Sequence, residues 1–457
     1  MWPEPTPTDV FIDRRRRLQQ RIQRPALFVA GLARPRNFAG NPYPFRAESH
    51  FLYFVGRHIE GAALVVGPSE AVLYAPEPDP EEELWTGPMP SLDELAAECG
   101  LPVRPLDELR PSPEMATLPA QDADSAAQQS ELFGREIVPG SGDDLDEANA
   151  VLADAVVEIR LQHDAGAIAQ LRQAAAATAR AHLAGFRATS IGVREALVRA
   201  HMEAAFAACG CVPAYAPIVT THGEVLHAIR QDRVLGAGDL LLADVGAETP
   251  EGWAGDVTRT WPVSGRFSPT QRAIYEVVLA AQNAAIERVR PGVRFAEVHR
   301  VAGHELVKGL VALGILSGDP VELAELGAAA LFFPHGVGHL LGLDVHDMED
   351  LGDRAGYAPG RSRSSRPGER YLRLDRDLLP GMAVTIEPGF YRIVRILESP
   401  DEVGGLEQHL NRRVLAEYDD VRGIRIEDDV LVTETGAEVL SREIPKEPAA
   451  IEAALAG

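Results

Sequence analysis

The segment 240–244 reads Leu-Leu-Leu-Ala-Asp, an apolar run that ends in an acid, and it restricts the possible folds more than any other feature. The pattern is typical of a buried strand, and an unpaired carboxylate at its end would be costly to remove from water. Asp256 follows twelve residues after Asp244, beyond a turn signal, and precedes Thr258 and Thr260. A hairpin would place the two aspartates on adjacent strands, with Asp256 and both threonines on one face.

Three of the thirteen histidines, His335, His339 and His346, lie in one segment of twelve residues that glycines interrupt. Residues four positions apart share a face on a helix or a strand, so His335 and His339 can converge. A lone histidine is more often structural than a ligand. Three histidines where glycines let backbones approach closely favour a functional site.

Two further acids end or interrupt strand-like segments. Glu387 closes an apolar run that Pro-Gly stops, and Glu427 lies in a segment that alternates apolar with charged residues. In that segment Arg425 and Glu427 share one face of the strand. Taken alone, each acid is more often an exposed charge or an ion-pair partner.

Together the four acids and His339 indicate a metal site. Four carboxylates carry a charge of −4, which two divalent cations balance, whereas four bare acids would repel one another. Oxygen-rich ligation with one imidazole suits Mn, Co, Fe or Zn more than a closed structural zinc site. Two such ions about 3.5–4 Å apart can share a water and lower its pKa toward 7. The chemistry predicted is metal-assisted hydrolysis, most plausibly of an acyl bond.

These segments resemble the motifs of the pita-bread metallopeptidases, the family of methionine aminopeptidase, aminopeptidase P (Xaa-Pro aminopeptidase) and prolidase. The resemblance covers roughly residues 155–440, in the order of the family, and favours the Xaa-Pro branch. Residues 44–56 also resemble the amino-terminal domain of aminopeptidase P and prolidase. The motifs that match are Asp244-Val-Gly, Gly255-Asp-Val-Thr-Arg-Thr, His335-Gly-Val-Gly-His, Asp344-Val-His-Asp, Thr385-Ile-Glu-Pro-Gly-Phe-Tyr and Gly423-Ile-Arg-Ile-Glu-Asp-Asp.

The resemblance implies an α+β fold, with a C-terminal pita-bread catalytic domain at 151–457 and a smaller α/β creatinase-like N-terminal domain and linker at 1–150. From the residues themselves, helices followed by strands occur twice between 164 and 432, which suggests a repeated half. Short apolar runs predict strands at 26–30, 51–55, 62–66 and 71–74. Residues 352–376 and 392–418 are charged or irregular and are interpreted as solvated loops.

The resemblance also implies roles for individual residues. Glu387 would take a proton from the nucleophilic water as well as bind metal, His346 would stabilise the tetrahedral intermediate or shuttle a proton, and His335 would line the substrate pocket. The metal ligands would be Asp244, Asp256, His339, Glu387 and Glu427, with Asp256 and Glu427 bridging the two ions.

Four more residues would contact or position the substrate. His227 matches a substrate-contacting histidine upstream of the first aspartate, and Arg425 would position groups near Glu427. Tyr391 is a further candidate. Trp85 resembles a tryptophan that in some relatives reaches the active site of a neighbouring subunit.

The activity implied is hydrolysis of the bond between an N-terminal residue and a following proline, by a water or hydroxide that bridges two divalent ions. Mn²⁺ is the first choice of metal, with Co, Zn or Fe as alternatives. A prolidase restricted to Xaa-Pro dipeptides and a non-catalytic pita-bread binding protein remain alternatives. The partners implied are peptides with proline at the second position and further copies of the chain, in a homodimer or homotetramer.

Charge and cysteine content narrow the class of protein further. The 457 residues include 44 basic and 68 acidic side chains, a net charge of −24, which disfavours binding to nucleic acid or to an anionic membrane. Cys99, Cys209 and Cys211 are too few for a disulfide framework. No apolar run approaches the about 20 residues of a membrane span, and no signal peptide is recognisable. A cytoplasmic location is expected.

Overall fold

The computed structural model describes residues 2–143 and 145–456, which divide into two compact units. One unit holds Glu4–Gln170 together with Met348–Ala355, and the other holds Leu171–Asp347 and the residues from Gly356 onward. The division at Gln170 lies beyond the boundary at 150 that the sequence suggested. It lies there because helix α6 (Glu147–Arg160) packs against α1 (Thr8–Gln19) of the N-terminal unit.

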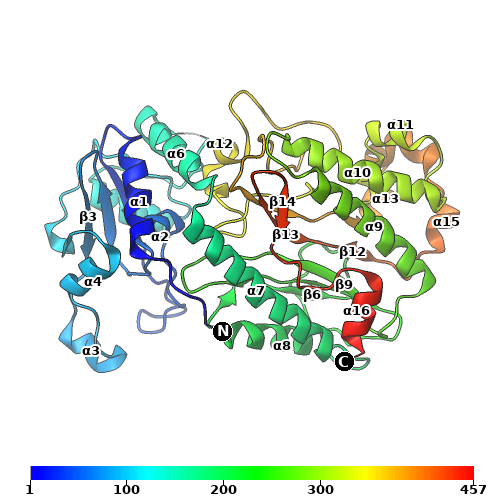
Figure 1. Ribbon diagram of the computed structural model, residues 1–457, viewed down its shortest axis with the longest axis horizontal. Helices are drawn as coiled ribbons and strands as arrows, with labels where there is room; N and C mark the ends of the chain where they lie inside the picture. Colours follow the sequence, from blue (N-terminus) through cyan, green and yellow to red (C-terminus); the bar gives the residue numbers. More distant parts are fainter. Residues whose placement is uncertain (1, 144, 457) are drawn as a thin grey trace. The chain divides into compact units, whose positions relative to one another are not determined.

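The N-terminal unit is built on a four-stranded sheet in the order β1-β2-β3-β4. Its first three strands are antiparallel and the fourth runs parallel to the third. Helix α1 lies beside this sheet, and a satellite core includes Leu27, Val29 and Phe133 (Figure 1). The elements are β1 (Ala26–Val29), β2 (Ala63–Val66), β3 (Ala71–Ala75), α3 (Pro80–Thr86), α4 (Leu92–Cys99), β4 (Val103–Pro105) and α5 (Ala123–Phe133).

The strand predicted at 51–55 was wrong, because these residues form helix α2 (Ser49–Val55). The Glu48 side chain accepts a hydrogen bond from the Phe51 N–H, and Gly56 ends the helix with a positive φ of 76°. Every residue of α2 is buried, so the run shows no polar face. Periodicity alone cannot distinguish a short buried helix from a buried strand, and here the two caps decide.

In the second unit, helices followed by strands occur twice, as the sequence predicted. Helices α7 and α8 precede the antiparallel sheet β6-β7-β9. Helices α9 and α10 precede the three-stranded sheet β10-β13-β14 and the two-stranded sheet β11-β12. The bounds are α7 (Ala165–Ala188), α8 (Glu195–Ala207), β6 (Ile218–Thr220), β7 (Leu240–Asp244), β9 (Thr258–Pro262), α9 (Pro269–Arg288), α10 (Phe295–Ala312), β10 (Ala383–Ile386), β11 (Gly389–Tyr391), β12 (Gly423–Arg425), β13 (Asp428–Val432), β14 (Ala437–Val439) and α16 (Pro448–Leu455).

Helices α9 and α10 run side by side in Figure 1 and pack along their length. A capping box at Ser268 and Gln271, with Pro269 at the first turn, starts α9. Among the described residues, no helix combines the length and the apolar character that crossing a bilayer requires.

The two segments that were interpreted as solvated loops, 352–376 and 392–418, both contain helical residues in the structure. Residues 392–418 contain the short helices α13 (Val394–Leu397), α14 (Pro400–Val403) and α15 (Arg412–Ala416), so this segment is not irregular. The other segment includes α12 (Asp353–Gly356) and continues to Leu372, whose backbone packs on Gly336.

A fully buried ion pair joins two of the sheets of the second unit, β6-β7-β9 and β10-β13-β14. Arg259 in β9 donates from Nη2 to Oδ1 of Asp428 in β13 at 2.7 Å, and both side chains are 0% exposed. Ser441, Gln282 and Lys446 donate to the same carboxylate at 2.7–2.9 Å. Burial alone would raise the pKa of Asp428, but Arg259 and Lys446 hold it well below its usual value.

Removing this charge should destabilise the fold strongly. We expect Asp428→Asn to lower the free energy of unfolding by about 3–5 kcal/mol, because Arg259 would remain buried without its anion. The midpoint of chemical denaturation measures the change. Since the pKa of Asp428 is depressed in the folded state, its contribution is present above pH of about 4 and should be lost as the pH falls.

Glu438→Gln is the matched control, because it also converts an acid to an amide in a neighbouring strand. Glu438 pairs with Arg172, with side chains 33% and 53% exposed, so the change should cost less than about 1 kcal/mol. Equal midpoints for the two variants would contradict the structural importance given to the buried pair.

Candidate metal centre

One cavity of the second unit, of about 430 Å³, gathers most of the residues singled out from the sequence. Its wall includes all five predicted ligands, three further histidines and one arginine. These nine residues are Asp244, Asp256, His339, Glu387, Glu427, His227, His335, His346 and Arg425.

The first two aspartates lie on the predicted hairpin, with Asp244 at the end of β7 and Asp256 just before β9. Strands β7 and β9 are antiparallel, with Asp244 opposite Thr258, and Asp256 lies two residues before β9 begins. The Asp256 N–H donates to the carboxylate of Asp429 at 3.1 Å, which fixes the backbone at this ligand.

Glu387 and His339 are held together through strand β10. The Thr385 N–H donates to His339 O at 3.0 Å, and the His339 N–H donates to the Thr385 hydroxyl at 3.1 Å. The Glu387 N–H donates to Val337 O at 2.8 Å. This approach needs Gly338, since a Cβ there would lie 1.9 Å from the carbonyl oxygen of Thr385. The glycine spacing that was noted in the sequence therefore has a steric cause.

Glu427 lies between β12 and β13 and is attached to β9. Its N–H donates to Thr258 O at 3.1 Å, and the Thr258 hydroxyl donates to Oε2 of Glu427 at 2.6 Å. Thr258 thus orients Glu427, a predicted ligand that is distant from it in the sequence.

The donor atoms fit a metal ion. Asp256, His339 and Glu427 are buried, and each offers one ligand atom within 4.8 Å of the others. His339 Nδ1 lies 3.0 Å from Leu340 O, which places the proton of the neutral ring on Nδ1. Nε2 then directs its lone pair toward Asp256 at 3.4 Å and Glu387 at 3.7 Å. Acceptors that face one another in this way need a proton or a metal ion between them.

Burial and mutual repulsion shift the titration of the cluster. Burial raises the pKa of Glu387 to about 7, with His339 and Arg425 opposing the rise. Burial and the neighbouring acids raise the pKa of Glu427 well above its usual value. Burial alone would lower the pKa of His339, but Asp256 and Glu387 raise it to about 9. Without metal, the cluster therefore holds protons that metal ligation would displace.

A second group of side chains forms one wall of the cavity. Arg425 donates to Asp244 Oδ2 at 2.6 Å and to the Tyr391 hydroxyl at 3.0 Å. The Tyr391 hydroxyl lies 2.9 Å from His335 Nε2, and His335 Nδ1 lies 2.8 Å from Gly336 O. Burial lowers the pKa of His335 to about 3, so the ring is neutral at neutral pH. Tyr391 thus supports the wall from behind and does not line the cavity itself.

The remaining predicted residues lie in different surroundings. His346 lines the cavity with its ring centroid 4.2 Å from that of His339, and exposed His227 lies at the edge. Trp85 is 84% exposed on α3 and is not among the residues that line this cavity.

Three residues of the site were missed from the sequence. The Tyr215 hydroxyl lies 2.5 Å from Asp244 Oδ1 and 2.6 Å from Asp256 Oδ1. Tyr371 and Arg373 line the cavity from a segment that was interpreted as a solvated loop. None of the three positions carries a motif or a periodicity that could have indicated the site.

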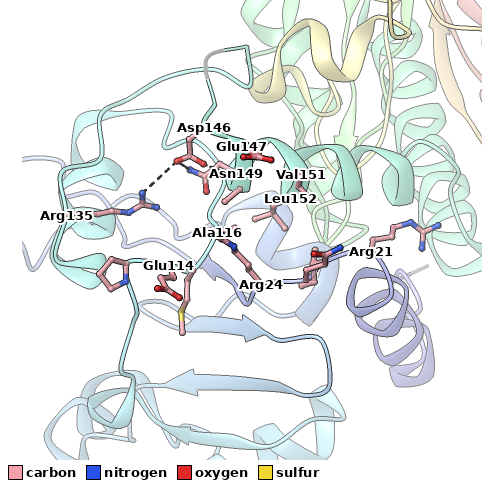
Figure 2. A pocket seen from close by; sticks show the side chains of 15 residues that line it. Arg21, Arg24, Glu114, Ala116, Arg135, Asp146, Glu147, Asn149, Val151 and Leu152 are labelled. Carbon is pink, nitrogen blue, oxygen red and sulfur yellow. Dashed lines mark hydrogen bonds and ion pairs between the residues drawn. The ribbon is translucent and has the colours of Figure 1, made fainter.

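A larger hollow, of about 590 Å³, lies within the N-terminal unit (Figure 2). Arg135 faces Asp146 there at 3.9 Å, and the lining also includes the basic residues Arg21 and Arg24 and the acidic residues Glu114 and Glu147. Among the described residues that line it there is no histidine or cysteine. Chemistry and not size therefore identifies the functional cavity.

Comparison with known families assigns both parts of the chain. Residues 169–434 match the model of metallopeptidase family M24, and residues 11–119 match that of the aminopeptidase P N-terminal domain. Relatives named probable Xaa-Pro aminopeptidase PEPP occur in Uncinocarpus reesii and Paracoccidioides brasiliensis. Both are 34% identical to this chain over 90% of its length, which corresponds to 85% and 87% of theirs.

Solved structures agree with this assignment. Pseudomonas aeruginosa aminopeptidase PepP superposes with a TM-score of 0.80 at 30% identity, covering 99% of this chain and 98% of that one. Aminopeptidase P from E. coli with the inhibitor Pro-Leu gives 0.79 at 30% identity, covering 99% of each chain. The resemblance and the α+β, two-domain architecture expected from the sequence are confirmed. The chain belongs to metallopeptidase family M24 and has the aminopeptidase P fold, an N-terminal domain followed by a pita-bread catalytic domain.

Proposed function

We propose that this chain is an Xaa-Pro aminopeptidase that hydrolyses the bond between an N-terminal residue and a following proline. The observation that carries the proposal is the convergence of four carboxylates and the His339 imidazole on one cavity. The names of the relatives support an aminopeptidase over the dipeptidase alternative. The complete ligand set argues against a non-catalytic binding protein.

Asp244, Asp256, His339, Glu387 and Glu427 would hold two divalent ions, and Mn²⁺ is the metal we propose. Such ions supply Lewis-acid activation of a carbonyl and of a water at neutral pH. A solved E. coli aminopeptidase P is described as zinc-substituted, which supports exchangeable divalent ions in a relative. We propose that Asp256 and Glu427, which share the most buried corner with His339, lie between the two ions.

The chain's own residues would handle the protons and the substrate. Glu387 lies beside His339 on the cavity wall, where its carboxylate is suited to accept a proton from the attacking water. His346 lines the cavity where it can hydrogen-bond the carbonyl of the scissile amide, and the neutral His335, whose two nitrogens are already hydrogen-bonded, would line the substrate pocket with its ring. Arg425, bonded to both Asp244 and Tyr391, would keep the ligand and the wall in register.

The chemistry of proline explains why a cavity wall that offers ring surfaces would be useful. A bond that precedes proline has no N–H and has a fixed φ, so a peptidase that grips that N–H cannot use it. His227 and Tyr371 at the cavity wall offer ring surfaces that do not depend on this N–H. We propose that they contact the residues that flank the scissile bond.

We further propose a cytoplasmic homodimer or homotetramer. Cys99, Cys209 and Cys211 are buried free thiols, which suits a reducing compartment. Trp85 and Leu84 are 84% and 79% exposed, and the resemblance suggests that Trp85 reaches the cavity of a partner copy. Light scattering should give a mass of two or four chains, and a monomer would refute this assembly.

Peptide hydrolysis tests the proposed activity directly. With Mn²⁺ added, we expect release of the first residue from Ala-Pro-Ala at a rate at least about 100-fold above that for Ala-Ala-Ala, which chromatography of the products measures. Cleavage of Ala-Pro alone would instead indicate a dipeptidase. Equal cleavage of both tripeptides would refute the proline preference.

Asp256→Asn tests the metal centre. The change keeps the shape of the side chain but removes the negative charge of one of the buried ligands. Loss of a residue that only hydrogen-bonds a ligand typically lowers metal affinity 10- to 100-fold, so loss of a ligand charge should lower it more than about 100-fold. Activity should be lost while the circular dichroism spectrum stays unchanged. Asp232→Asn is the control, because Asp232 is 55% exposed and should leave both unchanged. An active Asp256→Asn enzyme would refute the two-metal site.

Metal affinity should depend steeply on pH. Glu387 and His339 have pKa values near 7 and 9 without metal, and both must lose their protons before they can bind an ion. We therefore expect Mn²⁺ affinity to fall as the pH drops from 9 to 6, by about tenfold per unit for each proton displaced. Calorimetry in buffers of different ionisation enthalpy would count those protons. Constant affinity over this range would contradict the shifts.

A further inference from the structure

Tyr215 occupies a place in the metal centre that the residue roles above leave unexplained. Its hydroxyl lies 2.5 Å from Oδ1 of Asp244 and 2.6 Å from Oδ1 of Asp256. One phenol therefore touches both aspartates, although they lie twelve residues apart in the sequence. These distances also place the two Oδ1 atoms within about 5 Å of each other.

The backbone around Tyr215 is fixed by the same hairpin that carries the aspartates. The short strand β5 (Val212–Pro213) pairs with β8 (Ala247–Glu248), and the Ala214 N–H donates to Gly246 O at 2.9 Å. Gly246 follows Asp244 by two residues. A Cβ on Gly246 would lie 3.0 Å from Cε1 of Tyr215, so this glycine makes room for the ring.

The second oxygen of each aspartate faces a cationic or titratable partner. Asp244 Oδ2 accepts from Arg425 Nη2 at 2.6 Å, and Asp256 Oδ2 lies 3.4 Å from His339 Nε2. Asp244 is thus hydrogen-bonded at both oxygens, and Tyr215 is the hydrogen-bond partner that the two aspartates share. A hydroxyl has one proton, so it donates to one aspartate at a time and can alternate between them.

We infer that Tyr215 is a positioning residue of the metal centre, which holds the Asp244 and Asp256 carboxylates in the orientation that binds divalent ions. The inference rests on the proposed metal centre but not on the choice of peptide substrate. Partners of this kind, which hydrogen-bond a ligand without touching the metal, typically contribute 10- to 100-fold to metal affinity. Without the hydroxyl, two like charges would face each other with one restraint fewer.

The test is Mn²⁺ binding by Tyr215→Phe, which keeps the ring and removes only the hydroxyl. We expect apoprotein of this variant, titrated against a competing chelator dye, to bind Mn²⁺ about 10- to 100-fold more weakly than wild type. The deficit in peptide hydrolysis should shrink as Mn²⁺ is raised, because the groups that contact the substrate are intact. Wild-type affinity in Tyr215→Phe would overturn the inference.

Tyr275→Phe is the matched control. Tyr275 is another fully buried tyrosine of the same unit, and its hydroxyl donates to Lys446 O at 2.7 Å, away from the cavity. Its loss should leave Mn²⁺ affinity unchanged. If both variants lost affinity equally, the effect would reflect general destabilisation, and the role assigned to Tyr215 would be wrong.

Two further readouts keep the outcomes distinct. The rise in melting temperature that saturating Mn²⁺ produces is compared within each variant, so a less stable apoprotein does not obscure a change in binding. A smaller rise for Tyr215→Phe than for Tyr275→Phe supports the inference, and an equal rise opposes it. Wild-type protein that binds Mn²⁺ but cleaves no proline peptide would refute the proposed function and leave the Tyr215 result interpretable.

Discussion

Mutual repulsion among four carboxylates that share one cavity is the constraint on which the second unit depends. Two like charges about 4 Å apart repel by roughly 4 kcal/mol at the effective dielectric constant of a protein, and removal from water adds to that cost. Asp244, Asp256, Glu387 and Glu427 all face one cavity. A fold that brings them together must supply cations, hold protons or do both. The raised pKa values of Glu387 and Glu427 show that protons compensate where metal does not.

Three side chains near the cavity interact with the acidic groups individually. Arg425 pairs with Asp244, His339 faces Asp256, and the Thr258 hydroxyl orients Glu427. Outside the cavity, the buried pair of Arg259 and Asp428 ties together the strands that deliver these ligands. The charges that hold the sheets are thus separate from those that would bind metal, so the fold can tolerate changes in metal occupancy.

The acids were predictable because each follows a local pattern. Asp244 ends an apolar strand, and Glu387 ends another before Pro-Gly, so both can be recognised without knowing the fold. Tyr215 and Arg373 could not be predicted in this way. The pairing of β5 with β8 places Tyr215. Arg373 is placed through its neighbour Leu372, which contacts Gly336. Both contacts join residues that are distant in the sequence. The helix at Ser49–Val55 was missed for a local reason, since a fully buried run shows neither period.

Metal stoichiometry tests the central claim most directly. Protein saturated with Mn²⁺ and freed of unbound ions by gel filtration can be analysed for metal by mass spectrometry, with chain concentration from amino-acid analysis. Four carboxylates that need a charge of +4 predict two ions per chain. No bound ion, or one ion per chain in a preparation that cleaves Ala-Pro-Ala at its full rate, would contradict the dinuclear centre.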